Sequence, residues 1–157
     1  MLRPSADVTV LLADWLGAAA SGGDDVHYAA SASYLDTRGI SMAIGGKERD
    51  GHSNLTLNGR TAADLADNAD ASLSVRYVDA KGQSDTQDFT FGSPTYGLVI
   101  DSNDSHRARD FFAKGAGRLK LLDGTWEHVV TVALTDAHTD NYSYNVFSFG
   151  SFGRKVV

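Results

Sequence analysis

The sequence predicts a mainly β, α+β fold: an antiparallel β-sandwich or open barrel with one flanking helix, a short mid-chain helix and an N-terminal helix or arm. Three observations predict it. Short runs of alternating apolar residues recur along the chain, the 16 glycines far outnumber the 2 prolines, and of the 20 acidic residues only Glu48 and Glu127 are glutamates. Because aspartate favours turns and caps, whereas glutamate favours helix interiors, we expect many turns and few long helices.

The whole chain, residues 1–157, is expected to form a single domain, since its length suits one core and no linker or internal repeat divides it. Residues 1–24 are interpreted as an N-terminal helix or arm. Asp7 suits an N-cap, and apolar residues follow at helical spacing over 8–19. A glycine pair then ends this helix.

After the N-terminal segment the hydrophobic period changes to two, which is typical of strands. This alternation predicts a first strand over 26–34. Residues 45–54 are polar and glycine-rich, so we expect a surface loop or a hairpin arm there. A variant capping box then predicts a short mid-chain helix over 62–68.

The second half of the chain is predicted to form hairpins around one further helix. Residues 73–77 alternate as a strand, and 79–82 are the expected turn after it. Residues 106–114 are the predicted flanking helix, because capping residues precede them and two glycines follow them. An Asp-Gly pair at 123–124 is a hairpin signal ahead of a strand over 126–134.

Composition and charge argue against several classes of function. A net charge of −6 with scattered basic residues does not suit specific nucleic-acid binding. The lack of cysteine excludes disulfides, a thiolate nucleophile and cysteine-ligated metals. The only apolar run near the N-terminus is short and bracketed by aspartates, unlike a secretory signal, and no run approaches the roughly 20 residues of a membrane-spanning helix. We therefore expect a soluble protein with no membrane partner.

The sequence contains no recognised catalytic motif, so we expect no catalytic residue, no cofactor and no enzyme activity. One group has metal-binding residue types: Asp136, His138 and Asp140 project to the same side of an extended chain. The same residues also suit an ordinary turn before the next strand. The main expectation is therefore that no metal binds.

A cluster of aromatic residues near the C-terminus indicates an interface. Its alternation slips by one residue between Val146 and Phe147, which suggests a bulge or a strand that changes partners. Aromatic side chains on both faces of a strand suggest that both faces are covered, by the chain's own core or by a neighbouring subunit. The N-terminal segment and the polar loop add further candidates to this aromatic cluster. The candidate interface residues are Trp15, Lys47, Arg49, His52, Tyr142, Tyr144, Phe147, Phe149 and Phe152.

Two segments carry a resemblance to known proteins. They are SLSVRYVDAKGQS with TQDFTF (72–91) and RLKLLDGTWEHVVTVALTD (118–136). In layout they resemble small bacteriophage virion proteins of the tail-tube and head-decoration type. The resemblance covers residues 70–150 and carries over no functional residue. It implies a structural, self-assembling subunit of a phage-like particle (tail tube, neck or capsid decoration), located in the virion and assembled in the host cytoplasm. Its partners would be copies of itself and other particle proteins.

Two other functions stay open at this stage. The chain would serve as a small carbohydrate- or peptide-binding β-sandwich module if the C-terminal aromatic residues formed an exposed platform. It would be a small hydrolase or isomerase on a β scaffold if a pocket gathered His128 or His138 beside Asp136.

Overall fold

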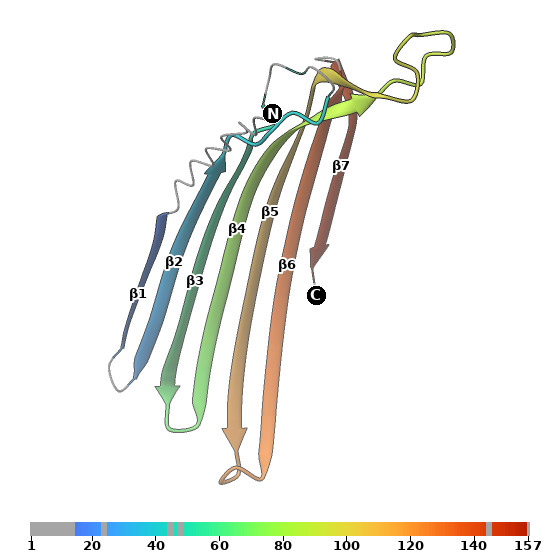
Figure 1. The fold of residues 1–157 in the computed structure, drawn as a ribbon. Coiled ribbons are helices and arrows are strands. Elements are labelled where there is room, and N and C mark those ends of the chain that lie inside the picture. The colour runs from blue at the N-terminus through green and yellow to red at the C-terminus, as the bar shows by residue number, and fades with distance from the viewer. Residues whose placement is uncertain (1–14, 23–24, 44–45, 47–48, 144–145, 157) are drawn as a thin grey trace.

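The computed structural model describes residues 15–22, 25–43, 46, 49–143 and 146–156. They form one antiparallel sheet in which each strand pairs with the next along the chain, in the order β1 to β7 (Figure 1). The strands are β1 (Trp15–Gly22), β2 (Val26–Thr37), β3 (His52–Ala66), β4 (Ala69–Gln87), β5 (Val99–Leu121), β6 (Trp126–Ser143) and β7 (Val146–Val156).

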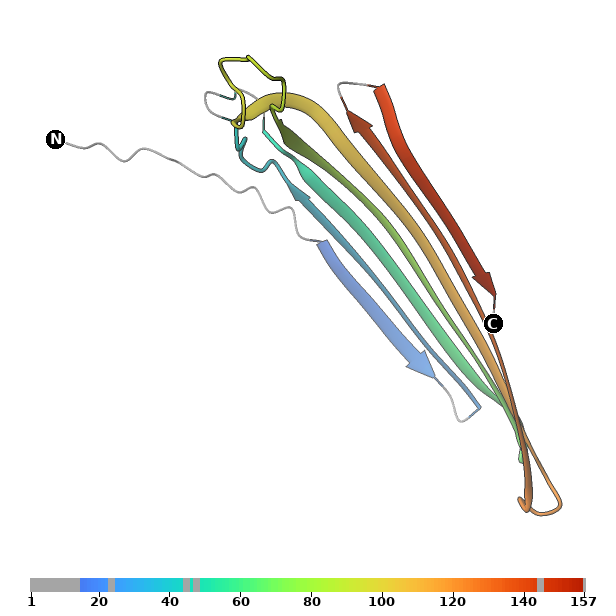
Figure 2. The same cartoon turned by 90° about the vertical axis from the view of Figure 1, so that its right-hand side faces the viewer.

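The sheet is a single curved layer of long strands (Figure 2). β5 alone has 23 residues and β4 has 19, against the usual five or six. Antiparallel β structure is therefore confirmed. The expected sandwich or open barrel is not confirmed, because the described residues contain neither a second sheet facing the first nor a closure between β1 and β7.

The connections differ at the two ends of the sheet. At the lower end of Figure 1, β3 is joined to β4 through 67–68, and β5 to β6 through 122–125. At the upper end, 38–51 joins β2 to β3 and 88–98 joins β4 to β5, and the described residues of these two connections form no strand. The Asp85 carboxylate fixes the first of these, because it accepts hydrogen bonds from the Ser41 hydroxyl and from two backbone N–H groups, those of Met42 and Ala43.

The predicted helices are wrong wherever the structure describes them. Residues 106–114 lie inside β5, where each residue pairs with both β4 and β6. Residues 62–66 belong to β3, and 67–68 form the turn after it. The part of the first helix within Trp15–Ala19 is strand β1, while 8–14 lie outside the described residues. Ladder hydrogen bonds to neighbouring strands outweigh the local capping signals that suggested helices.

Two further predictions about turns have different outcomes. The turn at 123–124 is confirmed: Asp123 and Gly124 both have positive φ (53° and 84°), and so does Leu122 at 52°. The turn at 79–82 is wrong, because β4 runs on to Gln87. The slip in alternation near Phe147 marks the start of a new strand, with a register shift between Asn141 and Tyr142 on β6.

No hydrophobic residue among those described is buried. The ordinary arrangement, in which one face of a sheet is covered by the rest of the domain, is therefore not present in this part of the chain. Among the described residues, no helix is long and apolar enough to cross a membrane.

Candidate functional site

The strongest functional feature is the difference between the two faces of the sheet. Residues directly opposite each other in an antiparallel ladder project to the same face, so the register assigns each strand residue to one side. On one face, alternate residues form an uncharged stretch on each of five neighbouring strands. This apolar band comprises alternate residues of 26–34 (β2), 55–63 (β3), 69–77 (β4), 111–121 (β5) and 126–134 (β6).

The apolar band contains no aspartate, glutamate, lysine or arginine. None of its large side chains is buried, and several are well exposed: Val130 is 65% exposed, Trp126 56% and Leu73 47%. Aromatic residues lie at its margins, with Tyr34, Tyr77 and Phe111 at the upper end and Trp126 at the lower end. The band thus presents an uncharged surface over five strands, with large apolar side chains along β4 and β6 and small residues through the middle of β2, β3 and β5.

The apolar band has a nearly constant height. It is nine residues long on β2, β4 and β6 and eleven on β5, which corresponds to about 26–33 Å along a strand, whereas on β3 residues 55–63 belong to a longer uncharged run over 53–65. In the register, the upper margin on β4 (Tyr77) lies two residues lower than the margin on β2 (Tyr34). The margin on β6 (Leu134) lies two residues lower again. The margin therefore shifts by two residues along a strand for every two strands crossed. This shift corresponds to a tilt of about 35° between the strands and the direction in the sheet that is perpendicular to the margins. The height of the band perpendicular to its margins is then about 22–27 Å.

Above the upper margin the same face becomes charged. This charged row contains Asp36, Asp79, Lys81, Arg107, Arg109, Asp136, His138, Asp140 and Arg154. Ion pairs cross between its strands. Arg107 donates two hydrogen bonds to Asp79, 3.0 and 2.6 Å long, from β5 to β4. These bonds hold the pKa of the Asp79 carboxyl below its usual value of 3.8.

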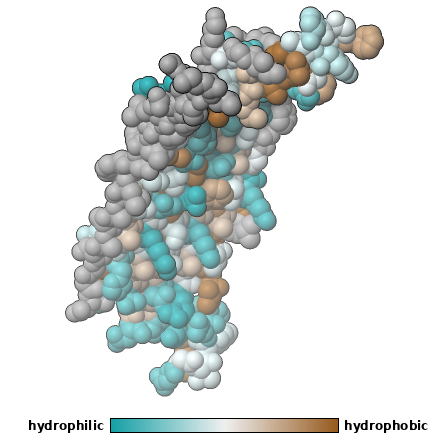
Figure 3. Space-filling view, viewed as in Figure 1, coloured by the Kyte–Doolittle hydropathy of each residue, from teal (hydrophilic) through white to brown (hydrophobic). Residues whose placement is uncertain are grey.

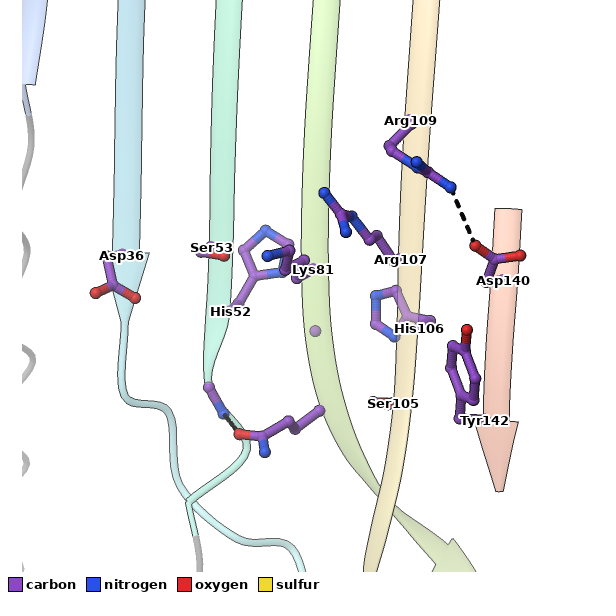
Figure 4. A pocket seen from close by; sticks show the side chains of 13 residues that line it. Asp36, His52, Ser53, Lys81, Ser105, His106, Arg107, Arg109, Asp140 and Tyr142 are labelled. Atoms are coloured by element: carbon purple, nitrogen blue, oxygen red, sulfur yellow. Dashed lines mark hydrogen bonds and ion pairs between the residues drawn. The ribbon is translucent and has the colours of Figure 1, made fainter. Parts of the chain in front are cut away.

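The ion pairs continue toward β7. Arg109 lies 3.4 Å from Asp140 on β6, and Figure 4 shows its guanidinium directed at that carboxylate. Arg154 on β7 donates to Asp136 on β6 at 2.6 and 3.0 Å. Neighbouring strands from β4 to β7 are therefore tied by at least one arginine–carboxylate pair each. A shallow depression in this region is lined by residues of β2 to β6, including His52, Lys81 and Tyr142 (Figure 4).

The opposite, polar face carries charge at the same height as the apolar band. Arg60, Arg76, Lys114 and Arg118 lie there, and Arg118 pairs with Asp70 at 2.6 Å. The face in view in Figure 3 is predominantly hydrophilic over the lower part of the sheet. The sheet thus separates an uncharged surface from a charged one.

The residues 88–98 form an ordered connection with exposed aromatic side chains. Hydrogen bonds from Ser93, Thr95 and the backbone of Thr90 hold the pKa of the Asp88 carboxyl far below its usual range. Two of these bonds, to the Thr90 N–H and the Thr95 hydroxyl, are 2.8 and 2.7 Å long. Phe91, on the same connection, is 96% exposed.

The residues suggested as a metal site lie on one strand, but their side chains have other partners. Asp136, His138 and Asp140 project to the same face of β6, as expected, although the strand continues through them and no turn is formed. Asp136 binds Arg154, and Asp140 binds both Arg109 and the His138 ring. Among the described residues, no group of three or more histidine, cysteine or acidic side chains is arranged to hold a metal ion.

The predicted interface residues do not come together at one place. His52 and Tyr142 both line the depression in the charged row, and Arg49 is exposed in the 38–51 connection. Lys47 and Tyr144 lie outside the described residues. The remaining four have a described backbone but no described side chain: Trp15 on β1 and Phe147, Phe149 and Phe152 on β7.

The apolar band was missed at the sequence level, although each of its runs is visible there. Five uncharged alternations were the available signal, and four of them meet a charged residue on the same phase at the upper margin: Asp36, Asp79, Arg109 and Asp136. Comparison of the chain with family models, curated proteins and solved structures found no match.

Proposed function

We propose that this chain is a section of a membrane-embedded antiparallel sheet, with the apolar band in contact with lipid chains and the polar face turned to an aqueous or protein-filled interior. The observation that carries this proposal is the uncharged band of nearly constant height, bounded at its upper margin by charged residues on β2, β4, β5 and β6. A membrane-spanning strand needs about 9–11 residues at a tilt near 45° and presents an apolar surface about 25 Å tall. The band has nine to eleven residues on β2, β4, β5 and β6, and its height and tilt of about 22–27 Å and 35° are close to those values.

The exposure of the apolar side chains supports the same proposal. Monomeric soluble proteins rarely expose a contiguous apolar patch larger than a few hundred Å². Here the band crosses five strands and none of its large side chains is buried. Lipid chains would remove this surface from water without a second protein layer.

The aromatic residues at the margins also fit a membrane. Tyrosine and tryptophan are enriched where a bilayer meets water, because one end of each ring is apolar and the other polar. Tyr34, Tyr77 and Trp126 occupy such positions, and the charged row begins directly above the tyrosines.

A bilayer places one further demand on the sheet. Its core offers no water to hydrogen-bond an open strand edge, so β1 and β7 would need partner strands there. We infer that the sheet continues beyond both edges by strand pairing, with strands of other copies or of other segments.

The open edges also favour a second candidate, the self-assembling particle subunit predicted from the sequence. Unpaired edge strands are templates for strand addition, and β1 and β7 each have one neighbour among the described strands. In that case a protein layer, and not lipid, would cover the apolar band. The phage resemblance remains a prediction.

One experiment separates the two candidates. The chain with Trp15→Phe retains Trp126 as its only tryptophan and is refolded with and without phosphatidylcholine vesicles. We expect lipid-dependent strand formation, quenching of Trp126 by brominated lipid and protection from aqueous iodide. Strand formation in water alone, with rings or tubes in electron micrographs and no quenching by lipid, would refute the membrane proposal and support the particle subunit.

A further inference from the structure

We propose that the middle of the polar face binds small anions that carry carboxylate or phosphate groups. The site consists of Arg60 on β3, Arg76 on β4 and Lys114 on β5, named here the cationic cluster. This inference rests on the proposed function, because the membrane arrangement is what makes the polar face an enclosed interior surface.

The register brings the three cations together. Arg60 lies directly opposite Ser74 on β4, and Ser74 lies directly opposite Lys114 on β5. Arg76 is two residues beyond Ser74 on the same face and is therefore diagonal to both other cations. Directly opposite and diagonal positions on an antiparallel sheet are about 5 and 7–8 Å apart, within reach of long side chains.

The cationic cluster lacks counter-ions in the described part of the chain. The side chains of Arg60, Arg76 and Lys114 form no ion pair and no hydrogen bond with the described residues, whereas those of Arg107, Arg109, Arg118 and Arg154 each bind an aspartate. The nearest acidic residue by register is Asp110, which is diagonal to Arg76 and forms no ion pair among the described residues. Three neighbouring positive charges without a partner repel one another, and a bound anion would relieve that repulsion.

The surroundings leave room for a ligand. Between and below the three cations the polar face carries small side chains: Ser72 and Ser74 on β4 and Ala116 on β5. Small residues let a solute approach the sheet while the long cationic side chains reach around it. Arginine provides paired N–H donors that match carboxylate and phosphate oxygens, and lysine adds a mobile charge.

The height of the cationic cluster within the sheet indicates its role. Its residues lie level with Gly59, Val75 and Ala113 of the apolar band, away from both ends of the strands. Charged side chains at membrane depth are costly unless they face a watery interior, and rings of lysine and arginine are used there to select anions. We infer that the polar face lines a route or a binding chamber for small anionic solutes.

The test measures anion binding by the whole 157-residue chain, folded in phospholipid vesicles, by isothermal titration with inorganic pyrophosphate and separately with citrate. The variant Arg60→Gln/Arg76→Gln/Lys114→Gln removes the cationic cluster. The matched control, Arg38→Gln/Arg49→Gln/Lys81→Gln, removes the same charge from exposed residues near the upper connections.

We expect the cluster variant to bind at least about a hundredfold more weakly, since each lost charge-assisted hydrogen bond costs about tenfold. The control should stay within about twofold, and added salt should weaken binding by the unsubstituted chain. Tighter binding of pyrophosphate than of citrate would assign phosphate as the ligand group, and the reverse would assign carboxylate.

Two results would overturn the inference: no binding of either anion by the unsubstituted chain, or equal loss in the two variants. All samples carry Trp15→Phe, so quenching of Trp126 by brominated lipid reports membrane insertion independently of anion binding. Insertion without anion binding refutes only the anion site, whereas a lack of insertion refutes the membrane proposal. Far-UV circular dichroism confirms that the variants fold, and the single variant Arg76→Gln replaces the triple one if it does not.

Discussion

An arginine at the centre of the apolar band tests for lipid contact when its cost is compared with that of an arginine at the margin. Leu73 is the middle residue of the nine in Ala69–Tyr77 and is 47% exposed in the sheet. The substitution Leu73→Arg therefore places a charge near the midplane of the proposed bilayer. We expect it to lower the free energy of unfolding from lipid by about 2–4 kcal/mol. A loss of about 3 kcal/mol shifts the folding equilibrium by a factor of about a hundred.

The neighbouring residue provides a matched control. Ser72 projects to the polar face, close to Asp70 by register, so Ser72→Arg adds the same charge on the other side of the same strand. We expect a change of less than about 1 kcal/mol, since that face is polar in either environment. A second control tests depth: Tyr77→Arg lies at the upper margin, where the cost should fall to about 0–1 kcal/mol.

The assay is urea unfolding of the chain in phosphatidylcholine vesicles, followed by tryptophan fluorescence and extrapolated to zero urea. The order of costs should be Leu73→Arg first, Tyr77→Arg next and Ser72→Arg last or equal to it. Equal costs for Leu73→Arg and Ser72→Arg would contradict the assignment of faces. Equal costs for Leu73→Arg and Tyr77→Arg would contradict a bilayer and favour a protein layer over the band.

Three further predictions concern single contacts. Asp79→Asn should lower the free energy of unfolding by about 0.5–1 kcal/mol at neutral pH, since it breaks the ion pair with Arg107. Because the pKa of Asp79 is lowered in the folded protein, this stabilisation is present above the ordinary pKa of 3.8 and is lost as the pH falls through the lower folded value. The urea midpoints of the two proteins should therefore converge in acid and not in base. Asp88→Asn should loosen the 88–98 connection and speed chymotryptic cleavage at Phe91, and an unchanged cleavage rate would show that Asp88 does not order it. Leu122→Asn should raise stability by about 1 kcal/mol, because leucine is strained at φ 52° and asparagine tolerates that conformation; an unchanged unfolding midpoint would argue against strain there.

The strands that could be predicted from the sequence are those in which alternation coincides with the apolar band. Residues 26–34, 73–77 and 126–134 lie within β2, β4 and β6, because their alternate residues form one uncharged face. The Asp-Gly turn at 123–124 was equally local, since positive φ there demands particular residue types. Local periodicity and turn chemistry were enough for these elements.

The upper halves of the strands could not be predicted in the same way. In 79–87 and 99–109 both faces carry polar or charged residues, so alternation disappears and a turn or a helix cap looks equally suitable. Adjacent Phe111 and Phe112 imitate a helical stripe, yet in β5 they project to opposite faces. Their strand structure depends on ladder bonds to residues about 30 positions away in the chain.

The margin of the apolar band also indicates what covers it. A second sheet packed across these strands would bury a patch whose outline follows its own side chains, with no need for a nearly equal length on β2, β4, β5 and β6. A bilayer is bounded by planes, so a tilted strand must change from apolar to charged at the height of that plane, and each neighbouring strand must do so with a regular offset. The change occurs after Tyr34 on β2, after Tyr77 on β4 and after Leu134 on β6, offset by two residues each time in the register. That regular offset is a property of the surroundings and not of any one strand, and it is why we favour lipid over a protein partner for this face.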